Sequence, residues 1–487
     1  MNRHLEELLS EVDRKEFYGE RDQLVTGISC DSRSIKPGYA FVAISGEKAN
    51  GHDFIDQALK KGTKVVFGEK PYSELTTTPP TYIKTENARE TLARLSHAFF
   101  GKPTNNLYTV GITGTNGKTT TVHLTKKVLG EEKSEIISTI TNKEIPGTKR
   151  PVTTPESPEI HEIAGEAIKN GKENFILEVS SHSLSLERVT AVEFNCGVFT
   201  NLTRDHLDYH DSLEAYKEEK MKLFRYLTKE GTAVVNGDEE FSEEIEKEAD
   251  GEVIQYGLDK TADVIATDIK KSKKGNEFVV LSPWGTQRIK TDLFGIYNVY
   301  NTLAAITVGL NRGIDLARIG RLLESVKGIR GRMEKLELTT GADIYIDFAH
   351  NSGAIEQILR ELSQLYPTTS IVFGCGGESD KGKRPEMGRV ASKYANRIFI
   401  TDDNPKSEDR MEILSEIQKG IKENSNYSVI PDRKTAIEKA IDELKPESCL
   451  LIAGKGHEQY QIVSDNWISH NDKEFVEKIC REKSLIQ

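Results

Sequence analysis

Residues 108–121 read "YTVGITGTNGKTTT", and this stretch decides the fold. The apolar run at 108–113 is typical of a buried strand, and the overlapping spacing G-x-x-G-x-x-G-K-T ends in Lys118 and Thr119 at the start of a helical pattern. A glycine-rich turn between a strand and a helix lets backbone N–H groups approach phosphate oxygens, and the helix N-terminus favours their negative charge. The stretch therefore predicts a P-loop within a parallel α/β sheet.

The residue types in this loop indicate a nucleotide such as ATP as the ligand. Lys118 can neutralise charge on the β- and γ-phosphates, and the Thr119 hydroxyl can ligand Mg²⁺. A glycine-rich turn with a purely structural role is the alternative, and the strand–turn–helix context argues against it. The predicted ATP-binding loop comprises Gly114, Thr115, Asn116, Gly117, Lys118, Thr119 and Thr120.

Length and composition exclude several classes of protein. A chain of 487 residues is expected to form about two to four domains. Its net charge of −11 argues against a general polyanion binder, and so against a nucleic-acid partner. No apolar stretch approaches the roughly 20 residues that span a bilayer, and the N-terminus has no apolar signal-peptide core. The cysteines are scattered without a C-x-x-C pair, so we expect a cytoplasmic protein without structural zinc.

Strand-like apolar runs alternate with helical patterns along the chain, for example "NFILEVS", "SIVFGCG" and "SCLLIAGKG". This rhythm predicts parallel sheets covered by helices, with ligands at the carboxyl ends of the strands. Joint-like segments at 99–107 and 327–337 divide the chain into predicted domains 1–103, 104–333 and 334–487. We therefore expect an α/β protein with three domains, a central P-loop-type parallel sheet and a C-terminal Rossmann-like doubly wound sheet.

Polar residues near other strand ends extend the predicted site. Glu178 ends a buried strand, where its carboxylate is either a Mg²⁺ ligand or a solvated strand cap. His206 and His210 are metal ligands or members of an ordinary loop. Lys220 lies in a helical pattern among acids, which by itself indicates an exposed i,i+4 ion pair.

Further candidates lie toward the C-terminus. Asn298 and Asn301 open a helical pattern one turn apart and are suited to an adenine edge, although helix capping and core packing explain them equally well. The turn "TDDNPKSED" at 401–409 follows another strand-like run. Charged residues that follow the ends of parallel strands would lie together on one face. They are Arg332, Asp347, His350, Lys381, Lys383, Arg384, Lys455, His457 and Glu458.

The order of these motifs resembles that of the Mur ligases, and within them the MurE branch. The resemblance rests on G-T-N-G-K-T-T, E-V-S-S-H, N-L-T-x-D-H-L-D-Y-H, G-R-M-E, D-F-A-H, D-N-P and G-K-G-H-E, and it extends to the N-terminal segment 28–54. It implies a three-domain, monomeric enzyme of peptidoglycan precursor synthesis. Such an enzyme uses ATP and Mg²⁺ to join an amino acid to UDP-N-acetylmuramoyl-L-Ala-D-Glu through an acyl phosphate.

The resemblance also implies residue roles. Positions matching those that hold the UDP-linked substrate are Ser29, Asp31, Ser32, Arg33, Thr153, Thr154, Ser180 and Arg188. The matching catalytic residues are Lys118, Lys220, Glu178 and His206, and the matching Mg²⁺ ligands are Thr119, Glu178, His206 and Lys220. The family carries this lysine as a carbamate, which turns an ammonium into an anion. Asn298, Asn301, Arg332 and Asp347 match the adenine and ribose side, and Asn404, Lys406, Gly454 and Glu458 match the amino-acid pocket.

The amino-acid pocket departs from the family's pattern. Diaminopimelate-adding members usually read D-N-P-R and G-C-G-G-D-R-D-K, and here Lys406 and Ser379 replace the two arginines. An arginine can bind a carboxylate through two parallel hydrogen bonds, whereas a lysine presents a point charge. Gly454 and Glu458, in contrast, match the diaminopimelate type. The usual D-Y-A-H-T-P also becomes D-F-A-H-N-S, which brings in Asn351.

Several functions stay open on the sequence. Meso-diaminopimelate is the favoured amino acid, and L-lysine or another amino acid in a specialised pathway are alternatives. A folate or polyglutamate-type ligase would lack the uridine segment, which is present at 28–54. A catalytically inactive binding protein would have lost the phosphate loop, Glu178 or Lys220, and all of these are retained.

Overall fold

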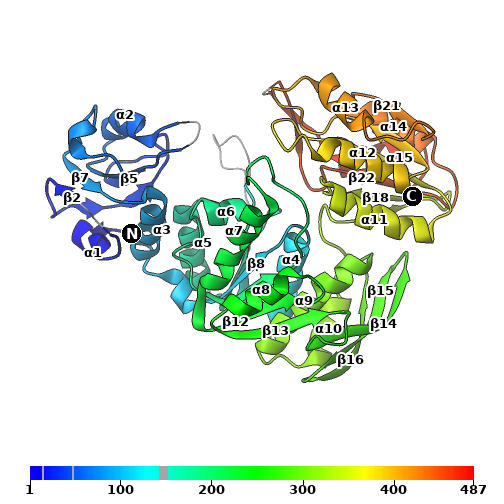
Figure 1. Ribbon diagram of the computed structural model, residues 1–487, viewed down its shortest axis with the longest axis horizontal. Coiled ribbons are helices and arrows are strands. Elements are labelled where there is room, and N and C mark those ends of the chain that lie inside the picture. The colour runs from blue at the N-terminus through cyan, green and yellow to red at the C-terminus, as the bar shows by residue number, and fades with distance from the viewer. Residues whose placement is uncertain (14–15, 47–48, 142–151, 465, 487) are drawn as a thin grey trace.

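The computed structural model describes residues 1–13, 16–46, 49–141, 152–464 and 466–486, so Glu47 and Lys48 of the predicted uridine segment lie outside the description. Figure 1 shows three lobes that follow one another along the chain, from blue at the N-terminus through cyan and green to red at the C-terminus. Each lobe is built on one sheet. The predicted three-domain α/β class is confirmed, and the exact domain borders stay a prediction.

The N-terminal lobe contains a five-stranded sheet in the order β2-β7-β6-β5-β4. The strands β4 to β7 run parallel, and β2 is antiparallel at the edge. Helix α3 packs against helix α5 of the central lobe, which joins the two lobes. The elements are β1 Arg3–His4, α1 Leu5–Leu9, β2 Glu16–Tyr18, β3 Leu24–Val25, β4 Gly27–Ser29, β5 Tyr39–Ala43, α2 Ile55–Lys60, β6 Val65–Gly68, β7 Thr81–Lys84 and α3 Ala88–Phe99.

The central lobe contains a nine-stranded sheet in the order β16-β15-β14-β13-β12-β11-β8-β10-β9. Its strands are β8 Tyr108–Thr113, β9 Ser134–Ile137, β10 Asn174–Glu178, β11 Phe194–Phe199, β12 Leu227–Asn236, β13 Glu252–Gly257, β14 Val264–Ser272, β15 Gly275–Ser282 and β16 Gly285–Thr291. The strands from β9 to β14 across this order are parallel, whereas β14, β15 and β16 form antiparallel hairpins. The sheet is therefore mixed, because turns at Gly275 and Gly285 fold its last strands back directly.

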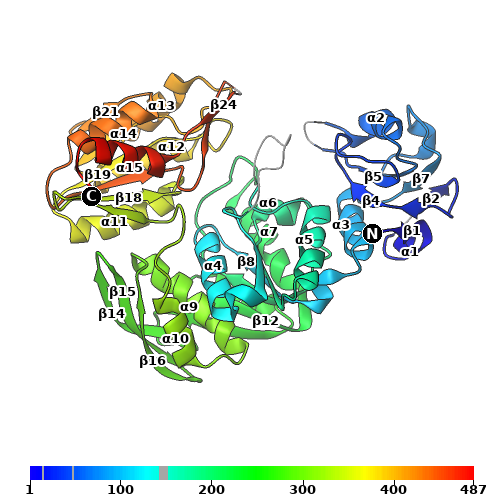
Figure 2. The same ribbon diagram turned by 180° about the vertical axis from the view of Figure 1, so that it is seen from behind.

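Helices cover both faces of the central sheet. They are α4 Lys118–Leu129, α5 Ser157–Lys169, α6 Ser181–Ser185, α7 Leu213–Arg225, α8 Phe241–Glu248, α9 Ile296–Asn311 and α10 Leu316–Glu324. Alternate residues of β8 face opposite sides, and Val110 and Ile112 pack with residues of α4, α9 and α10. Figure 2 shows α4 beside β8, with α9 and α10 next to it. The other side of the sheet holds Phe175, Leu177 and Phe199 under α5, α7 and α8. Strand β8 therefore lies inside the sheet, with its carboxyl end open to a ligand.

The C-terminal lobe contains a six-stranded sheet in the order β17-β18-β22-β19-β20-β21, parallel except for β17. Helices α11, α12 and α13 cover one face, and α14 and α15 cover the other. This is the doubly wound arrangement that the sequence predicts. The elements are β17 Glu334–Glu337, β18 Asp343–Asp347, α11 Ser352–Leu365, β19 Thr369–Phe373, α12 Lys383–Tyr394, β20 Arg397–Ile400, α13 Arg410–Gln418, β21 Tyr427–Val429, α14 Arg433–Asp442, β22 Cys449–Ala453, β23 Tyr460–Val463, β24 Asn466–Ser469 and α15 Asp472–Glu482.

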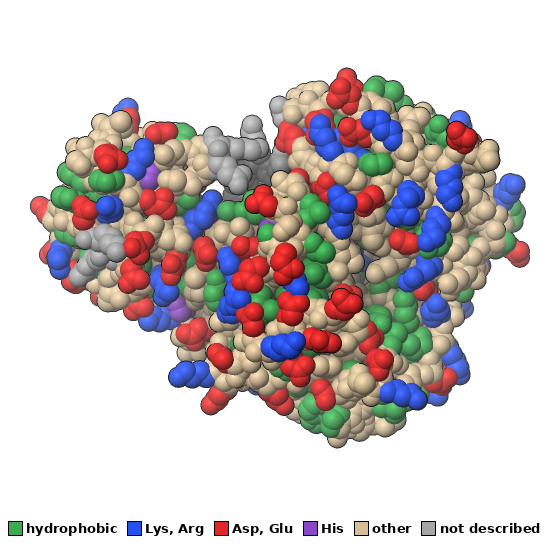
Figure 3. Space-filling model, in the orientation of Figure 1, with side chains coloured by type: hydrophobic (Ala, Val, Ile, Leu, Met, Phe, Trp, Pro, Cys, Tyr) green, Lys and Arg blue, Asp and Glu red, His purple; other side chains and the backbone are tan. Residues whose placement is uncertain are grey.

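Two surface properties bear on possible partners. Acidic and basic side chains intermingle on the face shown in Figure 3. Among the residues described, no helix has both the length and the apolar character needed to cross a bilayer.

A fully buried arginine holds the strand ends of the C-terminal lobe together. Arg433 donates to both carboxylate oxygens of Asp472, at 2.9 and 2.7 Å, and to the carbonyls of Asp402 and Ala453. These carbonyls follow β20 and end β22, so one guanidinium fixes two of the strand ends that carry the predicted pocket. His470 lies 2.7 Å from Asp472, and the carboxylate is fully enclosed.

We predict that Asp472→Asn lowers the free energy of unfolding of this lobe by about 3–5 kcal/mol, because the Arg433 charge would stay buried without a counter-ion. Burial acts to raise the pKa of Asp472, but Arg433 and the hydrogen bonds outweigh it and hold that pKa below its ordinary value. The pair's contribution is therefore complete above about pH 4 and is lost as the pH falls further. Urea unfolding can be followed through Trp467 in a Trp284→Phe background.

The matched control is Asp442→Asn. Asp442 pairs with Lys483 at 2.7 Å on the surface and is half exposed, so its loss should change the unfolding free energy by less than about 1 kcal/mol. Equal effects of the two substitutions would contradict the assigned importance of the buried pair.

Candidate active site

The glycine-rich loop between β8 and α4 has the backbone geometry that a phosphate site requires. Gly114 has φ +139° and Gly117 has φ +88°, a region that favours glycine. A Cβ atom at Gly114 would lie 1.9 Å from the Thr200 hydroxyl oxygen, and one at Gly117 would lie 2.3 Å from Oδ1 of Asn301. No side chain other than hydrogen fits at either glycine without a shift of its neighbours.

Residues after β11 support the loop from one side. The Asn116 N–H donates to Oδ1 of Asn201 at 2.9 Å, and the Asn116 carbonyl accepts from the Thr200 hydroxyl at 2.7 Å. The Thr115 hydroxyl lies 3.1 Å from the Thr203 carbonyl and 3.2 Å from the Tyr216 hydroxyl. The loop is thus hydrogen-bonded to the segment after β11 and to Tyr216 of α7.

Two lysine side chains meet on a single backbone carbonyl of this loop. Nζ of Lys118 and Nζ of Lys220 both donate to the Gly114 carbonyl oxygen at 2.9 Å, and Lys118 also donates to the Thr115 carbonyl at 2.8 Å. Lys220 lies on α7 with 1% of its surface exposed, over the Tyr216 ring. The position of Lys220 among acids predicted an exposed ion pair. This prediction is wrong, because the tertiary fold buries this face of α7.

Burial and mutual repulsion disfavour two ammonium groups here. Burial lowers the pKa of Lys118. Burial and the neighbouring Lys118 hold the pKa of Lys220 well below its ordinary value. A neutral Lys220 amine is a nucleophile, and only a neutral amine can take up CO₂ to form a carbamate. The environment of Lys220 thus favours the modification that the resemblance implies.

Glu178 closes the site on the next strand. Its carboxylate accepts from the Thr139 N–H at 2.8 Å and from the Thr139 hydroxyl at 3.0 Å, and 1% of the residue is exposed. The Glu178 carbonyl accepts from the Thr154 hydroxyl at 2.8 Å, so β10 and the segment after residue 151 are joined. A carboxylate has about four acceptor positions, so positions for a cation remain on Glu178.

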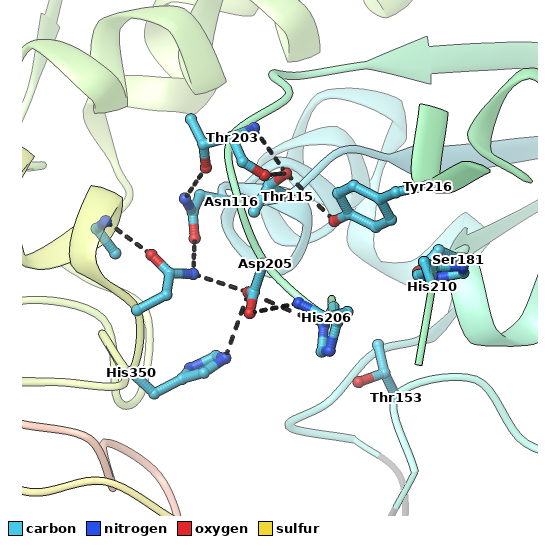
Figure 4. A network of polar contacts seen from close by, with 12 residues as sticks. Thr115, Asn116, Thr153, Ser181, Thr203, Asp205, His206, His210, Tyr216 and His350 are labelled. Atoms are coloured by element: carbon cyan, nitrogen blue, oxygen red, sulfur yellow. Dashed lines mark hydrogen bonds and ion pairs between the residues drawn. The ribbon is translucent and has the colours of Figure 1, made fainter. Parts of the chain in front are cut away.

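Asp205 and His206 lie on the loop after β11, where the His206 and His210 rings lie near that of Tyr216 in tilted and edge-on arrangements (Figure 4). The His206 ring lies 4.8 Å from that of His182, and burial lowers the pKa of His206 to about 3 and that of His182 to about 4. His206 is therefore neutral at pH 7 and has a lone pair to offer a metal. His210 instead hydrogen-bonds Ser181 at 2.9 Å, which explains it as a structural residue.

The predicted adenine and ribose residues fall into two groups. Asn298 donates to the Phe294 carbonyl at 2.7 Å, and Asn301 donates to Asn298 at 3.0 Å, so both lie buried at the start of α9 beside the loop. The Asp347 carboxylate accepts from two backbone N–H groups, those of Met333 and Ala349. The Arg332 guanidinium donates to the Thr119 hydroxyl at 2.8 Å, so it also reaches the start of α4, and its predicted role on the ribose side stays a prediction.

The residues predicted to hold the UDP-linked substrate are divided between two lobes. On the central lobe, Arg188 donates to the Thr154 carbonyl at 2.9 Å and pairs with Glu156 at 2.7 Å. The Ser180 hydroxyl caps α6 at Ser183, and the Thr153 hydroxyl accepts from that of Thr139 at 3.3 Å. These residues adjoin the Glu178 site.

On the N-terminal lobe, the predicted uridine residues bond mainly to one another. Asp31 accepts from Arg33 through Nε and Nη2, the latter at 2.8 Å, and this hydrogen bonding lowers the pKa of Asp31. The Ser32 hydroxyl donates to Gln57 at 2.6 Å, and Ser29 bonds within the same turn. The turn lies at the carboxyl end of β4, as expected for a ligand site.

The predicted amino-acid pocket is a connected polar network. Oδ1 of Asn404 accepts from the Lys455 ammonium at 2.9 Å, and its amide donates to Glu458 at 3.1 Å. Lys455 is fully buried and lies 2.6 Å from Glu458 and 3.7 Å from Asp403. Gly454 has φ +108°, and a Cβ there would come within 2.6 Å of the Asp403 carboxylate. Asn404, Gly454 and Glu458 are thus brought together by the structure.

Lys406 and Ser379 border this network. Lys406 has φ +54°, and its backbone bonds to the Ile462 carbonyl and the Ser464 N–H of the β23–β24 hairpin at 3.0 and 2.8 Å. The Ser379 hydroxyl donates to the Gly376 carbonyl at 2.8 Å, so it is used within its own loop.

A cation at the phosphate end would depend on unusual ligands. Throughout the described part of the chain, no three His, Cys, Asp or Glu residues are grouped so as to hold a metal ion. Of the predicted ligands, only Glu178 and His206 are of these types. The Thr119 hydroxyl and a modified Lys220 would have to supply the rest, and Mg²⁺ prefers such oxygen ligands.

Sequence reasoning missed two contributors to the site. Thr139 and Asp205 contact predicted residues directly, through Glu178 and the loop at His206. Lys455, which the sequence analysis named among the charged residues at strand ends, contacts Asn404 after β22. The Thr139 and Asp205 contacts depend on how neighbouring strands order themselves, which a single sequence does not reveal.

The chain resembles known proteins along its whole length. Residues 24–100, 112–309 and 331–456 match the models of the Mur ligase family catalytic domain, the Mur ligase middle domain and the Mur ligase glutamate ligase domain. A protein of Caldanaerobacter subterraneus subsp. tengcongensis, a UDP-N-acetylmuramoyl-L-alanyl-D-glutamate–2,6-diaminopimelate ligase, is 39% identical over 96% of this chain and 97% of its own. A Clostridium tetani protein of the same name is 36% identical over 98% and 99%. A solved structure of a ligase with this name covers both chains fully, with 28% identity and a TM-score of 0.68.

We predict that Gly114→Ala abolishes binding of an ATP analogue, because the new Cβ would collide with Thr200 and the backbone conformation would be strained. Isothermal titration calorimetry measures the binding. The matched control is Gly313→Ala, which also has a positive φ, +71°, but has open space around the new Cβ. The control should lose about 1 kcal/mol of stability and keep full affinity. Retained binding in Gly114→Ala would contradict the assignment of this loop.

Proposed function

The chain belongs to the Mur ligase family, and on this premise we propose that it joins a diamino acid, meso-2,6-diaminopimelate being favoured, to UDP-N-acetylmuramoyl-L-alanyl-D-glutamate with ATP. The observation that carries the proposal is the placement of Lys118 and Lys220 on the Gly114 carbonyl. Lys118 at a glycine-rich loop can supply positive charge to an anionic ligand, Lys220 beside it is suited to become a carbamate, and the loop's backbone suits the phosphates of ATP. The full-length similarity to diaminopimelate ligases supports the substrate.

The first step is activation of the dipeptide's terminal carboxylate. That carboxylate attacks the γ-phosphorus of ATP, the bond from this phosphorus to the β,γ-bridging oxygen breaks, and ADP leaves with the electron pair. Both reactants are anions, so the charge of Lys118 at the loop lowers the barrier to their approach. Arg332 supplies a second positive charge, because its guanidinium reaches Thr119 at the start of α4.

The side chains around the glycine-rich loop offer ligands that fit Mg²⁺. The ion would be held by Thr119, Glu178, His206 and a carbamylated Lys220. Bound there, Mg²⁺ would neutralise phosphate charge. His206 is the least typical of these ligands, because Mg²⁺ prefers oxygen, and its low pKa at least keeps the ring neutral. Lys220 as a carbamate would also remove the repulsion between the two lysines.

The second step joins the amino acid. Its neutral amine attacks the acyl phosphate carbon, a tetrahedral intermediate forms, and phosphate leaves as the amide is completed. The amino acid must approach from the C-terminal lobe, where Asn404, Lys406, Gly454 and Glu458 would hold it. The lobe carrying this pocket must therefore be positioned against the phosphate loop during the reaction.

The other substrate is oriented from the N-terminal side. Ser29, Asp31, Ser32 and Arg33 would bind the uridine diphosphate, and Thr153, Thr154, Ser180 and Arg188 would bind the sugar and peptide. Glu156, at the N-terminus of α5, pairs with Arg188 of the second group. We propose that the enzyme works as a cytoplasmic monomer, in the synthesis of the peptidoglycan precursor.

We predict that Lys220→Ala abolishes turnover and that formate or acetate partly restores it, because a small carboxylate can replace the lost carbamate. A CO₂-free buffer should lower the activity of the unmodified protein, and bicarbonate should restore it. Phosphate release measures turnover. Lys222→Ala is the control: this lysine lies on the same helix but forms a partly buried pair with Glu219 and does not bond to the Gly114 carbonyl. Full activity of Lys220→Ala without added carboxylate would refute the carbamate.

We predict that phosphate is released from ATP only when both the UDP-linked dipeptide and the correct amino acid are present. A panel of meso-diaminopimelate, L-lysine, L-ornithine and L-glutamate identifies that amino acid, with meso-diaminopimelate expected to have the highest kcat/KM. Lys406→Arg should keep or lower the KM for meso-diaminopimelate, because a forked guanidinium grips its carboxylate better. No release with any amino acid would refute the ligase. A loss of activity in Lys406→Arg would indicate a different amino acid.

A further inference from the structure

Asn351 occupies an unusual position between the C-terminal and central lobes. It precedes α11, and its Oδ1 accepts from the Ala354 N–H at 2.8 Å, which makes it the N-cap of this helix. Only 1% of its surface is exposed. The amide nitrogen of an N-cap Asn normally faces solvent. Because Asn351 is buried, its two amide hydrogens need partners other than water.

Both partners belong to the central lobe. Nδ2 of Asn351 donates to Oδ1 of Asn116 at 3.2 Å and to Oδ2 of Asp205 at 2.9 Å. Asn116 lies in the phosphate loop itself, between Thr115 and Gly117, and Asp205 precedes His206. Figure 4 shows Asn116, Asp205 and His350 converging on one point. The side chain of Asn351 thus uses all three of its principal hydrogen-bonding positions, and two of them cross between the lobes.

The other polar contacts near this point are weaker candidates for the same role. Arg204 pairs with Glu386 at 2.9 Å, but the two side chains are 48% and 31% exposed, so water and salt screen the pair. His350 comes only within 3.9 Å of Asp205. The buried amide of Asn351 is therefore the contact that fixes the start of α11 against the phosphate loop.

We propose that Asn351 is a positioning residue for the ligase reaction, which locks the C-terminal lobe onto the nucleotide loop through Asn116 and Asp205. This inference rests on the proposed function, because only a two-lobe reaction needs the amino-acid pocket held against ATP. Asn351 does not contact the substrates itself. It acts on them through Asn116 and Asp205. A nucleotide that orders Asn116 thereby favours docking of α11, and a docked lobe favours the ordered loop.

The first test distinguishes the role of Asn351 between the two lobes from its role as the N-cap of α11. Asn351→Thr keeps an N-cap oxygen for Ala354 but removes the forked amide, so the melting temperature should stay within about 2 °C while kcat falls about 5- to 20-fold. Asn351→Asp also caps the helix, but places a second carboxylate beside Asp205 and should lower kcat further. Asn471→Thr is the control, since Asn471 caps α15 in the same lobe without contacting the central lobe.

The second test needs no turnover. Exchanging the two groups, by combining Asn351→Asp with Asp205→Asn, restores a donor and an acceptor. The amide then at position 205 can donate to the carboxylate at position 351, and the Asn116 amide can turn to donate as well. X-ray scattering with an ATP analogue should show an expanded radius of gyration for Asn351→Asp alone and a compact one for the exchanged pair. Arg204→Gln should expand the protein less, and only at low salt.

Two results would overturn the proposal. One is a kcat for both Asn351→Thr and Asn351→Asp equal to that of the unsubstituted chain. The other is an exchanged pair that scatters like Asn351→Asp alone. If the ligase function fails, the unsubstituted chain releases no phosphate, whereas the scattering experiment still reports on the lock, so the two failures are distinguishable.

Discussion

The site depends on the meeting of two lysine side chains at one backbone carbonyl. Lys118 reaches the Gly114 oxygen from α4, and Lys220 reaches it from α7 on the opposite face of the sheet. Buried like charges at this separation repel strongly, so the arrangement persists only if an amine is neutral, is modified to an anion, or faces an anionic ligand. Each possibility suits a site that must bring a carboxylate and a triphosphate together. The sheet order β11-β8-β10 is what places α4, α7 and Glu178 around the same point.

The other two lobes bring their ligand sites to this point by different means. Helix α3 packs on α5 and carries the predicted uridine turn toward Glu156 and Arg188. The C-terminal lobe is attached through polar contacts, which include Arg332 on Thr119 and Asn351 on Asn116, and through an apolar contact in which Phe294 packs against Tyr345. Water can replace the hydrogen bonds when such contacts separate, whereas parting Phe294 from Tyr345 would expose apolar surface.

Much of this arrangement was predictable from the sequence, for physical reasons. The loop at 111–119 was evident because its glycines are required by local backbone geometry, and the three-domain α/β class followed from alternating strand and helix patterns. The antiparallel strands β14 to β16 were missed, because "VIATDIKKS" has only a short apolar start and then becomes polar and charged, without the continuous apolar run of a buried strand. The burial of Lys220 could not be read from its acidic neighbours, since the packing of α7 on the sheet overrides the local pattern. The contacts of Asn351 and Thr139 are long-range, and no local spacing encodes them.

The predicted amino-acid pocket contains substitutions that the structure helps to interpret. Lys406 stands where an arginine is usual, yet its left-handed backbone and its bonds to the β23–β24 hairpin fix where its side chain starts. Nearby, Asp403 and Glu458 face Lys455 around Asn404, and burial raises the pKa of Glu458. With Lys406, the predicted pocket would contain two acidic and two basic groups. Such a balanced set complements a zwitterionic end, with an ammonium and a carboxylate, better than it complements a lone carboxylate or a lone amine. Meso-diaminopimelate presents that zwitterion at the end opposite the reacting amine, whereas lysine presents only an ammonium there, and this difference favours diaminopimelate despite the missing arginines.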